Sequence, residues 1–282
     1  MRIYLDSKDI IEILEKSKPC SAIGFKEFLQ SGNHELILSF VTVMEISEPL
    51  LHKKASTNVM RLLNQLEDLP HLFIHSSRIT LLELQQAYNS FCSDIEYKDV
   101  DIPFEKRFDT VVDLNGQPST SPYLNYPLAE TVWDLYNFNA LGGLDNYASK
   151  LISSFEADRA IKPRPKLKEN FQKTVGLNSR QNQLEIPMQD IKPLANWIYS
   201  NPNRCPSDRL GYELWHKMIR NLEDIPTPSD LEDFHNIGCL PYVDIMTLDR
   251  RMHGYVCQVS NSLNVNYDQK IFRNTNEFMK QM

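Results

Sequence analysis

Short apolar runs alternate with segments of helical periodicity at both ends of this chain. A short apolar run suits a strand that is buried on both faces of a sheet, and the helical pattern beside it suits a helix that packs on that sheet. No hairpin signal separates the runs. We therefore expect an α/β fold with a parallel sheet covered on both faces by helices. The runs are RIYLD (2–6), ELILSFVTV (35–43), LFIHS (72–76) and YVDIMTL (242–248), with VNYD (265–268) as a further short candidate.

Helical patterns lie beside these runs. The sequence predicts helices in IIEILEKS (10–17), MEISEPLLHKK (44–54), TNVMRLLNQLEDL (57–69), RITLLELQQAYNSF (78–91) and DLEDFHNIGCL (230–240). From about residue 97 to 215 the pattern is irregular, and helical stretches alternate with prolines and polar clusters. We expect residues 1–90 and 216–282 to form the core of the fold, with residues 91–215 as a large, mainly helical insertion.

Composition limits the class of protein. A chain of 282 residues with 41% hydrophobic content can bury a substantial core. It contains no apolar run near 18 residues, and its first ten residues, MRIYLDSKDI, carry a charge where a signal peptide would be apolar, so we expect a cytoplasmic protein without a membrane span. The five cysteines form no CxxC pair, and both the GxGxxG and P-loop patterns are missing, so we expect neither zinc nor a nucleotide cofactor.

The net charge of −7 hides a basic stretch. Residues 159–180 contain seven Lys or Arg and one Glu, a local net charge of +6, so the rest of the chain carries −13. Pro163 and Pro165 oppose a helix at that point of the stretch. The stretch is either a solvated linker or an arm that contacts nucleic-acid phosphates.

Acidic residues follow the predicted strands. Asp6 and Asp249 each stand at the carboxyl end of a run, and Glu45 comes just after the second run. Ligands of open parallel sheets bind outside the carboxyl ends of the strands, so these acids are candidates for one cleft. Asp230 and Asp233 share one face of the first turn of a predicted helix, where acids also commonly answer the helix dipole.

Such a cluster of acids needs a cation. Two like charges about 4 Å apart repel by roughly 4 kcal/mol at an effective dielectric constant near 20. Hard divalent ions such as Mg²⁺ or Mn²⁺ prefer carboxylate oxygens and keep sites open for substrate phosphates. One or two such ions can activate water and stabilise the leaving oxygen of a phosphodiester, which is the chemistry of a nuclease.

Three segments resemble the PIN (PIN-like) nuclease family. RIYLDSKDI is similar to its opening strand and first acid, ILSFVTVMEISEPL to its strand and helix acid, and DLEDFHNIGCLPYVDIMTLDRRM to its closing helix, strand and acid. The resemblance covers about the first 85 residues and roughly residues 227 to 265. It implies a PIN-like three-layer fold that carries a metal-dependent endoribonuclease. The long middle region departs from compact members of the family.

The resemblance assigns roles to individual acids. It implies catalytic acids at Asp6, Glu45, Asp233 and Asp249, and metal ligands at these four positions and at Asp230 and Asp244. The helix acid could be Asp230 or Asp233, because both lie near the start of that helix. Asp244 and Asp249 lie an odd number of residues apart, near opposite ends of one strand. Asp244 could therefore accept backbone N–H bonds instead of acting behind the metal site.

Basic residues supply candidate phosphate contacts. Arg250 and Arg251 directly follow Asp249 and could clamp phosphate or form surface ion pairs. Thr247 could orient a carboxylate, although Thr is common in strands. Further substrate-binding candidates in the basic stretch are Lys162, Arg164, Lys166 and Lys168.

The sequence favours an endoribonuclease that uses Mg²⁺ or Mn²⁺ and binds RNA. Two alternatives stay open: a non-catalytic RNA-binding or protein-interaction protein with this fold, and a structure-specific DNA nuclease. A regulatory protein partner and an oligomeric state are both compatible with the family.

Overall fold

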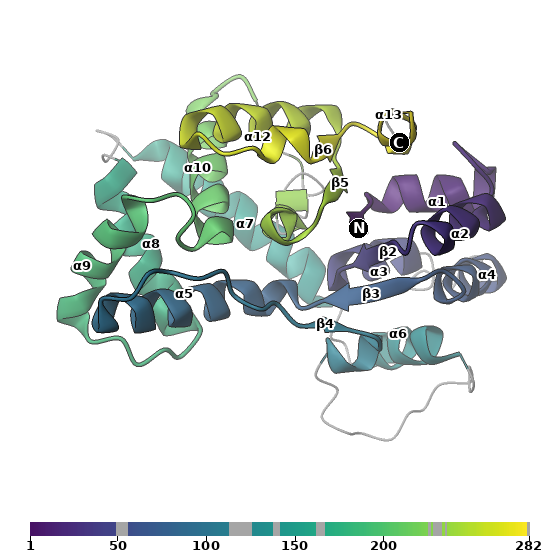
Figure 1. The fold of residues 1–282 in the computed structure, drawn as a ribbon, viewed down its shortest axis with the longest axis horizontal. Helices are drawn as coiled ribbons and strands as arrows, with labels where there is room; N and C mark the ends of the chain where they lie inside the picture. Colours follow the sequence, from purple (N-terminus) through teal and green to yellow (C-terminus); the bar gives the residue numbers. More distant parts are fainter. Residues whose placement is uncertain are drawn as a thin grey trace.

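A single sheet of six strands organises the chain (Figure 1). The computed structural model describes residues 1–48, 56–112, 126–137, 142–161, 167–224, 227, 233–234 and 236–280. The strand order is β4-β3-β2-β1-β5-β6, and every pairing is parallel except that of β3 with β4. The strands are β1 (Arg2–Tyr4), β2 (Glu35–Leu38), β3 (His71–Ile74), β4 (Phe104–Glu105), β5 (Ile245–Thr247) and β6 (Ile271–Phe272). The predicted α/β class with a mainly parallel sheet is confirmed.

Helices occupy most of the remaining described chain. The α-helices are α1 (Ser7–Lys16), α2 (Ala22–Ser31), α3 (Phe40–Ser47), α4 (Ser56–Glu67), α5 (Ser76–Ser93), α6 (Pro127–Asn137), α7 (Gly142–Ala160), α8 (Leu167–Gln181), α9 (Met188–Tyr199), α10 (Pro206–Arg220), α12 (Arg250–Leu263) and α13 (Thr275–Met279). Short 3₁₀ helices span η2 (Phe108–Thr110), η3 (Leu240–Tyr242) and η4 (Tyr267–Gln269). No helix in the described ranges combines the length and apolarity that crossing a bilayer requires.

The alternation of side chains along each strand builds a hydrophobic core on both faces of the sheet. Ile3, Leu36 and Phe73 lie in one buried cluster, which also contains residues of α1, α3, α4 and α6. Tyr4 and Ile37 face the opposite side, in a cluster with residues of α10 and α12. Full burial of one such aliphatic or aromatic side chain is worth roughly 1.5 to 3 kcal/mol, so both clusters stabilise the sheet.

Three predicted strands differ from the structure. The run YVDIMTL (242–248) is a strand only over Ile245–Thr247, because Tyr242 is the last residue of η3. The run at residues 35–43 is a strand only to Leu38, because Ser39 caps α3 by accepting a hydrogen bond from the Thr42 backbone N–H. The run VNYD is not a strand: Tyr267 begins η4, and β6 starts only at Ile271. The antiparallel strand β4 was not predicted.

A second body of helices stands at the carboxyl end of β3. Figure 1 shows α5 leading away from β3 towards α8 and α9. A separate buried cluster joins α5, α8, α9 and α10, with Leu84, Phe171, Ala195 and Tyr212 among its members. We call α5, α7, α8, α9 and α10 the helical body.

The predicted core and insertion do not separate where the sequence placed their boundaries. The boundary at 215/216 falls inside α10, whose Leu214 and Met218 pack in the cluster of the sheet. In α6, Val132 packs on the sheet although the helix lies within the predicted insertion. In α5, Leu84 packs in the helical body although it lies within the predicted core. Packing therefore divides the chain differently from the linear order of its patterns.

Candidate functional site

Asp6 and Asp249 stand at the carboxyl ends of two neighbouring strands. In the parallel pair of β1 and β5, Tyr4 is opposite Met246, so the residues that follow both strands emerge at the same edge. Each aspartate is the N-cap of the next helix. Oδ1 of Asp6 accepts a hydrogen bond from the Lys8 backbone N–H at 2.8 Å, and Oδ1 of Asp249 accepts one from the Met252 backbone N–H at 2.6 Å. Two acids from opposite ends of the chain thus emerge at the same edge of the sheet.

The charge at this edge is only weakly compensated. Burial raises the pKa of Asp6 above its usual range, and the neighbouring carboxylates of Asp9 and Asp249 raise it further. The hydrogen bond from the Lys8 N–H opposes this shift, and the Lys8 ammonium opposes it least. Among the described residues, Oδ2 of Asp6 and Oδ2 of Asp249 have no hydrogen-bond partner. Each cap therefore fixes one carboxylate oxygen and leaves the other open to a ligand.

Asp9 belongs to the same edge, and the sequence analysis missed it. The Thr247 hydroxyl accepts a hydrogen bond from the Asp6 backbone N–H at 2.8 Å and lies near the Asp9 carboxyl. The Thr275 backbone N–H donates to Oδ1 of Asp9 at 3.4 Å. Burial raises the pKa of Asp9, and these donors oppose the shift. Thr247 therefore holds the backbone of Asp6 at this edge.

Tyr4, at the end of β1, belongs to a buried network of hydrogen-bonded side chains. The Tyr4 hydroxyl lies 2.8 Å from Ser39 Oγ and 2.7 Å from Thr42 Oγ1. Ser39 Oγ donates to Asn236 Oδ1 at 2.9 Å. All four side chains are buried. The network ties β1, the start of α3 and the segment before β5 into one unit, and Asn236 is a member that sequence reasoning did not find.

Glu45 lies one helical turn from this network. Glu45 follows Thr42 by three residues in α3 and is half-buried, and its charge contributes to the raised pKa of Tyr4, for which burial is the largest cause. Residues three apart share a helix face, so Glu45 borders the network. Asp233 is half-buried and precedes Asn236 of the network by three residues in the chain. Asp230 lies outside the described residues.

The structure does not bring Asp244 to the other acids. Asp244 is exposed at the amino end of β5, where its backbone N–H donates to Arg2 O at 2.9 Å and its Oδ2 accepts from the Arg2 N–H at 2.8 Å. Because β1 and β5 are parallel, this is the edge opposite Asp6 and Asp249. Its predicted place among the metal ligands has no geometric support, and its contacts match the alternative of accepting a backbone N–H.

The structure describes only some of the basic residues that were predicted to contact phosphate. Arg251 pairs with Asp224 through two contacts, Nη2 to Oδ1 at 2.7 Å and Nε to Oδ2 at 3.0 Å, whereas Arg250 is exposed. In the basic stretch, Lys168 is exposed in the first turn of α8. Arg159 instead donates to carbonyl oxygens at the end of α10, Met218 O at 3.2 Å and Asn221 O at 2.5 Å. Lys162, Arg164 and Lys166 lie outside the described residues.

The donor set suits a hard divalent cation. Within the described ranges, no three His, Cys, Asp or Glu side chains converge closely enough to hold a metal ion by themselves. Mg²⁺ is usually held by only one or two carboxylates and completed by waters and substrate phosphates. The open oxygens of Asp6 and Asp249 fit that pattern in donor type and number.

No protein-family model, no curated protein and no solved structure matches this chain. Inferences about its function therefore rest on the residues of this edge and on the resemblance of its short segments.

Proposed function

We propose that this chain is a metal-dependent nuclease with a PIN-like fold that hydrolyses RNA phosphodiester bonds. One observation carries the proposal. Asp6 and Asp249, the first and last acids of the resemblance, emerge side by side at the carboxyl ends of β1 and β5, and each keeps one oxygen outside its helix cap. Neighbouring carboxylates at the ligand-binding edge of a parallel sheet repel one another, and a divalent cation stabilises them.

The residues of the edge divide the work. Asp6 and Asp249 would hold Mg²⁺ or Mn²⁺, with Glu45 and Asp233 as further acids beside them. A bound divalent ion lowers the pKa of a coordinated water and offsets the negative charge of the scissile phosphate. The two helix caps fix the orientation of the carboxylates, and Thr247 holds the backbone of Asp6. The Tyr4, Ser39 and Asn236 contacts keep the surrounding segments in register.

RNA is preferred to DNA because the resembled family mainly cleaves RNA, and an RNA substrate suits the cytoplasmic location expected from the sequence. The test is a cleavage assay on single-stranded RNA, duplex RNA, single-stranded DNA and flap DNA, each with Mg²⁺, with Mn²⁺ or with EDTA. We expect RNA cleavage with either ion and none with EDTA. RNA binding without cleavage under every condition would instead support the non-catalytic alternative, and preferred cleavage of flap DNA would support the DNA nuclease.

The control variant is Asp6→Asn. Asparagine is as good an N-cap as aspartate, so this variant keeps the start of α1 and removes the charge. Cleavage that persists at the wild-type rate in purified Asp6→Asn protein would come from a contaminant or from a different site.

A further inference from the structure

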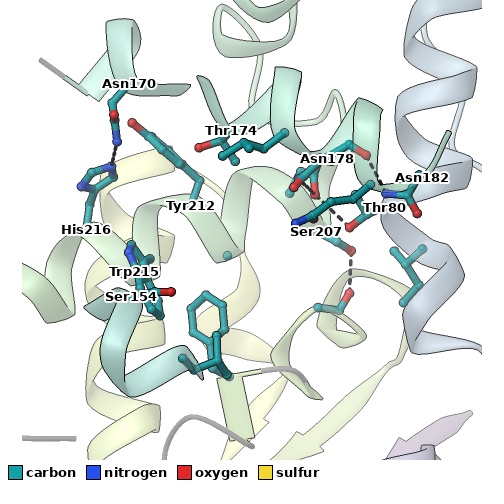
Figure 2. A pocket seen from close by; sticks show the side chains of 18 of the residues that line it. Thr80, Ser154, Asn170, Thr174, Asn178, Asn182, Ser207, Tyr212, Trp215 and His216 are labelled. Carbon is teal, nitrogen blue, oxygen red and sulfur yellow. Dashed lines mark hydrogen bonds between the residues drawn. The ribbon is translucent and has the colours of Figure 1, made fainter. Parts of the chain in front are cut away.

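A polar pocket of about 620 Å³ lies within the helical body, between α5, α7, α8 and α10 (Figure 2). Figure 2 shows Asn170 and His216 at one end and Thr80, Asn178 and Ser207 at the other. This volume is typical of pockets that enclose a small molecule or one part of a larger ligand. The cleavage chemistry proposed above uses none of these residues.

The pocket adjoins the candidate site through two segments. Ser76, at the start of α5, lines it directly after β3, which stands two strands from β1 in the sheet, a separation of about 10 Å. Gly238 also lines the pocket, and its carbonyl oxygen accepts a hydrogen bond from Ser207 Oγ at 2.5 Å. Two residues earlier in the chain, Asn236 accepts a hydrogen bond from Ser39 of the buried network. A chain that is bound at the carboxyl edge can therefore extend into the pocket.

The chemistry of the pocket excludes phosphate and favours a flat ligand with N–H groups. Among the described residues that line it, there is no Lys or Arg, but there are two carboxylates, Asp158 and Asp208. Trp215 and Phe234 contribute aromatic surface, with ring centroids 5.5 Å apart in an edge-to-face arrangement. Aromatic surface beside hydrogen-bonding amides is how proteins hold an unstacked base.

Asp208 can serve as the acceptor for such a ligand. Its Oδ1 accepts a hydrogen bond from Thr80 Oγ1 at 2.9 Å, while Asn178 Nδ2 lies 3.3 Å from Oδ1 and 3.4 Å from Oδ2. Burial raises the pKa of Asp208 to about 6, against these hydrogen bonds. Oδ2 therefore has only one long contact and retains capacity to accept an N–H group from a ligand.

We infer that this pocket receives one nucleobase of the bound RNA and selects bases that carry an amino group, through the Asp208 carboxylate. This inference rests on the proposed function. Uracil can offer a carboxylate only its ring N3–H, which lies between two carbonyl oxygens that repel the carboxylate, whereas adenine, cytosine and guanine each offer an exocyclic amino group. Stacking on an aromatic side chain is worth about 1 to 3 kcal/mol per base, so the pocket can contribute measurably to affinity.

The rim of the pocket suits the attached backbone. Leu177 lines the pocket and is 49% exposed, so it marks the rim. Lys173 and Arg180 are exposed on α8, four residues before and three residues after Leu177, and so lie on the same helix face. The base enters a pocket whose described lining has no Lys or Arg, while the phosphates pass the basic side chains of Lys173 and Arg180 outside it. This arrangement gives part of the basic stretch a specific role.

The test measures binding without cleavage. Short oligouridylates that differ only in one central base are titrated in EDTA against the wild-type protein by fluorescence anisotropy. We expect the oligomers with adenine, cytosine or guanine at that position to bind about tenfold more tightly than the all-uracil oligomer, which is about 1.4 kcal/mol. Asp208→Asn should reduce this preference, because asparagine keeps an acceptor for Thr80 but removes the charge.

Thr174 lines the pocket. Two variants at this position separate the effect of filling the pocket from the effect of losing the hydroxyl. Thr174→Phe should abolish the base preference by occupying the pocket, whereas Thr174→Val should keep it. Equal affinities for all oligomers in the wild-type protein would overturn the inference, and so would a preference that survives both Thr174→Phe and Asp208→Asn.

The experiments distinguish an error in the pocket inference from an error in the proposed nuclease function. If RNA is cleaved with Mg²⁺ but no base preference exists, the pocket inference is wrong and the nuclease stands. If no RNA is cleaved but the base preference is present and sensitive to Thr174→Phe, the nuclease is wrong and the pocket stands. Should Thr174→Phe not fold, Asp208→Asn alone decides the inference.

Discussion

The carboxyl edge of the sheet and the helical body both contain carboxylates, but the two sets of carboxylates differ in their hydrogen-bond partners. At the edge, Asp6 and Asp249 each use one oxygen for a helix cap and leave the other without a partner among the described residues. In the helical body, both oxygens of Asp208 have amide or hydroxyl neighbours, and Glu83 accepts three hydrogen bonds.

This difference indicates what each region can bind. Neighbouring carboxylates that each keep one oxygen without a donor favour a cation, because a cation removes their mutual repulsion. Carboxylates whose neighbours donate hydrogen bonds are already largely satisfied, so they hold structure together or accept one more N–H group. A buried acid is thus informative only together with the groups that contact it.

The largest effect is expected on cleavage, from the two aspartates that flank β5. Asp249→Asn should keep the cap of α12 and lower the rate of RNA cleavage by about 1,000-fold or more, because a metal ligand contributes several kcal/mol in the transition state. Asp244→Asn is the matched control at the opposite edge. It should leave cleavage unchanged and alter the free energy of unfolding by about 1 kcal/mol or less, since its hydrogen bond to Arg2 is exposed.

Single-turnover cleavage and urea unfolding of both variants check this prediction. Equal cleavage by folded Asp249→Asn and Asp244→Asn proteins would remove the distinction between the two edges. A stable but inactive Asp244→Asn protein would show that the two aspartates have been assigned to the wrong tasks.

The next effect is expected on stability, in the helical body. Glu83 is fully buried in α5 and accepts from the Ser207 N–H at 2.9 Å, the Asp208 N–H at 3.2 Å and the Tyr242 hydroxyl at 2.6 Å. Glu83→Ala should lower the free energy of unfolding by about 3 kcal/mol, because one buried and two partly buried donors lose their acceptor. Glu83→Gln keeps an acceptor oxygen and should cost about 1 kcal/mol. Thermal and urea unfolding measure both, and a Glu83→Ala protein as stable as the wild type would refute this structural role.

The smallest effect has the opposite sign and depends on pH. Burial and the neighbouring acids raise the pKa of Asp6, so ionising Asp6 opposes folding. This cost is absent below the ordinary pKa of an aspartate, develops as the pH rises through the raised pKa, and is complete above it. In EDTA, Asp6→Asn should therefore melt a few degrees above the wild type at pH 7, and the gap should narrow at pH 4.5. A gap that is constant or reversed with pH would show that Asp6 carries no electrostatic strain.

Local patterns predicted the parts of the fold that local physics determines. The runs that begin at Arg2, Glu35 and Tyr242 each contain a strand, and Asp6 and Asp249 could be placed because each stands at the carboxyl end of such a run. The strand predicted at residues 40–43 failed because Ser39 caps a helix there, and this local contact outweighs the strand preference of two valines.

Features that depend on contacts between distant parts of the chain could not be predicted from the sequence. Strand β4 has only two residues, too few for a pattern, and it pairs with β3 across the whole of α5. Asp9 gives no signal in the sequence, because acids are common in the first turn of a helix and β5, which carries Thr247, is distant in the chain. The pocket could not be predicted either, because its walls come from helices whose order in space follows from packing and not from periodicity.

The most direct test of the central claim is the binding of Mn²⁺ at the carboxyl edge, followed by electron paramagnetic resonance of the free ion. We predict that the wild-type protein removes Mn²⁺ from solution, that Mg²⁺ competes for the site, and that Asp244→Asn binds as the wild type does. Asp6→Asn and Asp249→Asn should each weaken this binding at least about tenfold, since each removes one charged ligand. Mn²⁺ binding that is absent from the wild type, or equal in all four proteins, would contradict a metal site between Asp6 and Asp249.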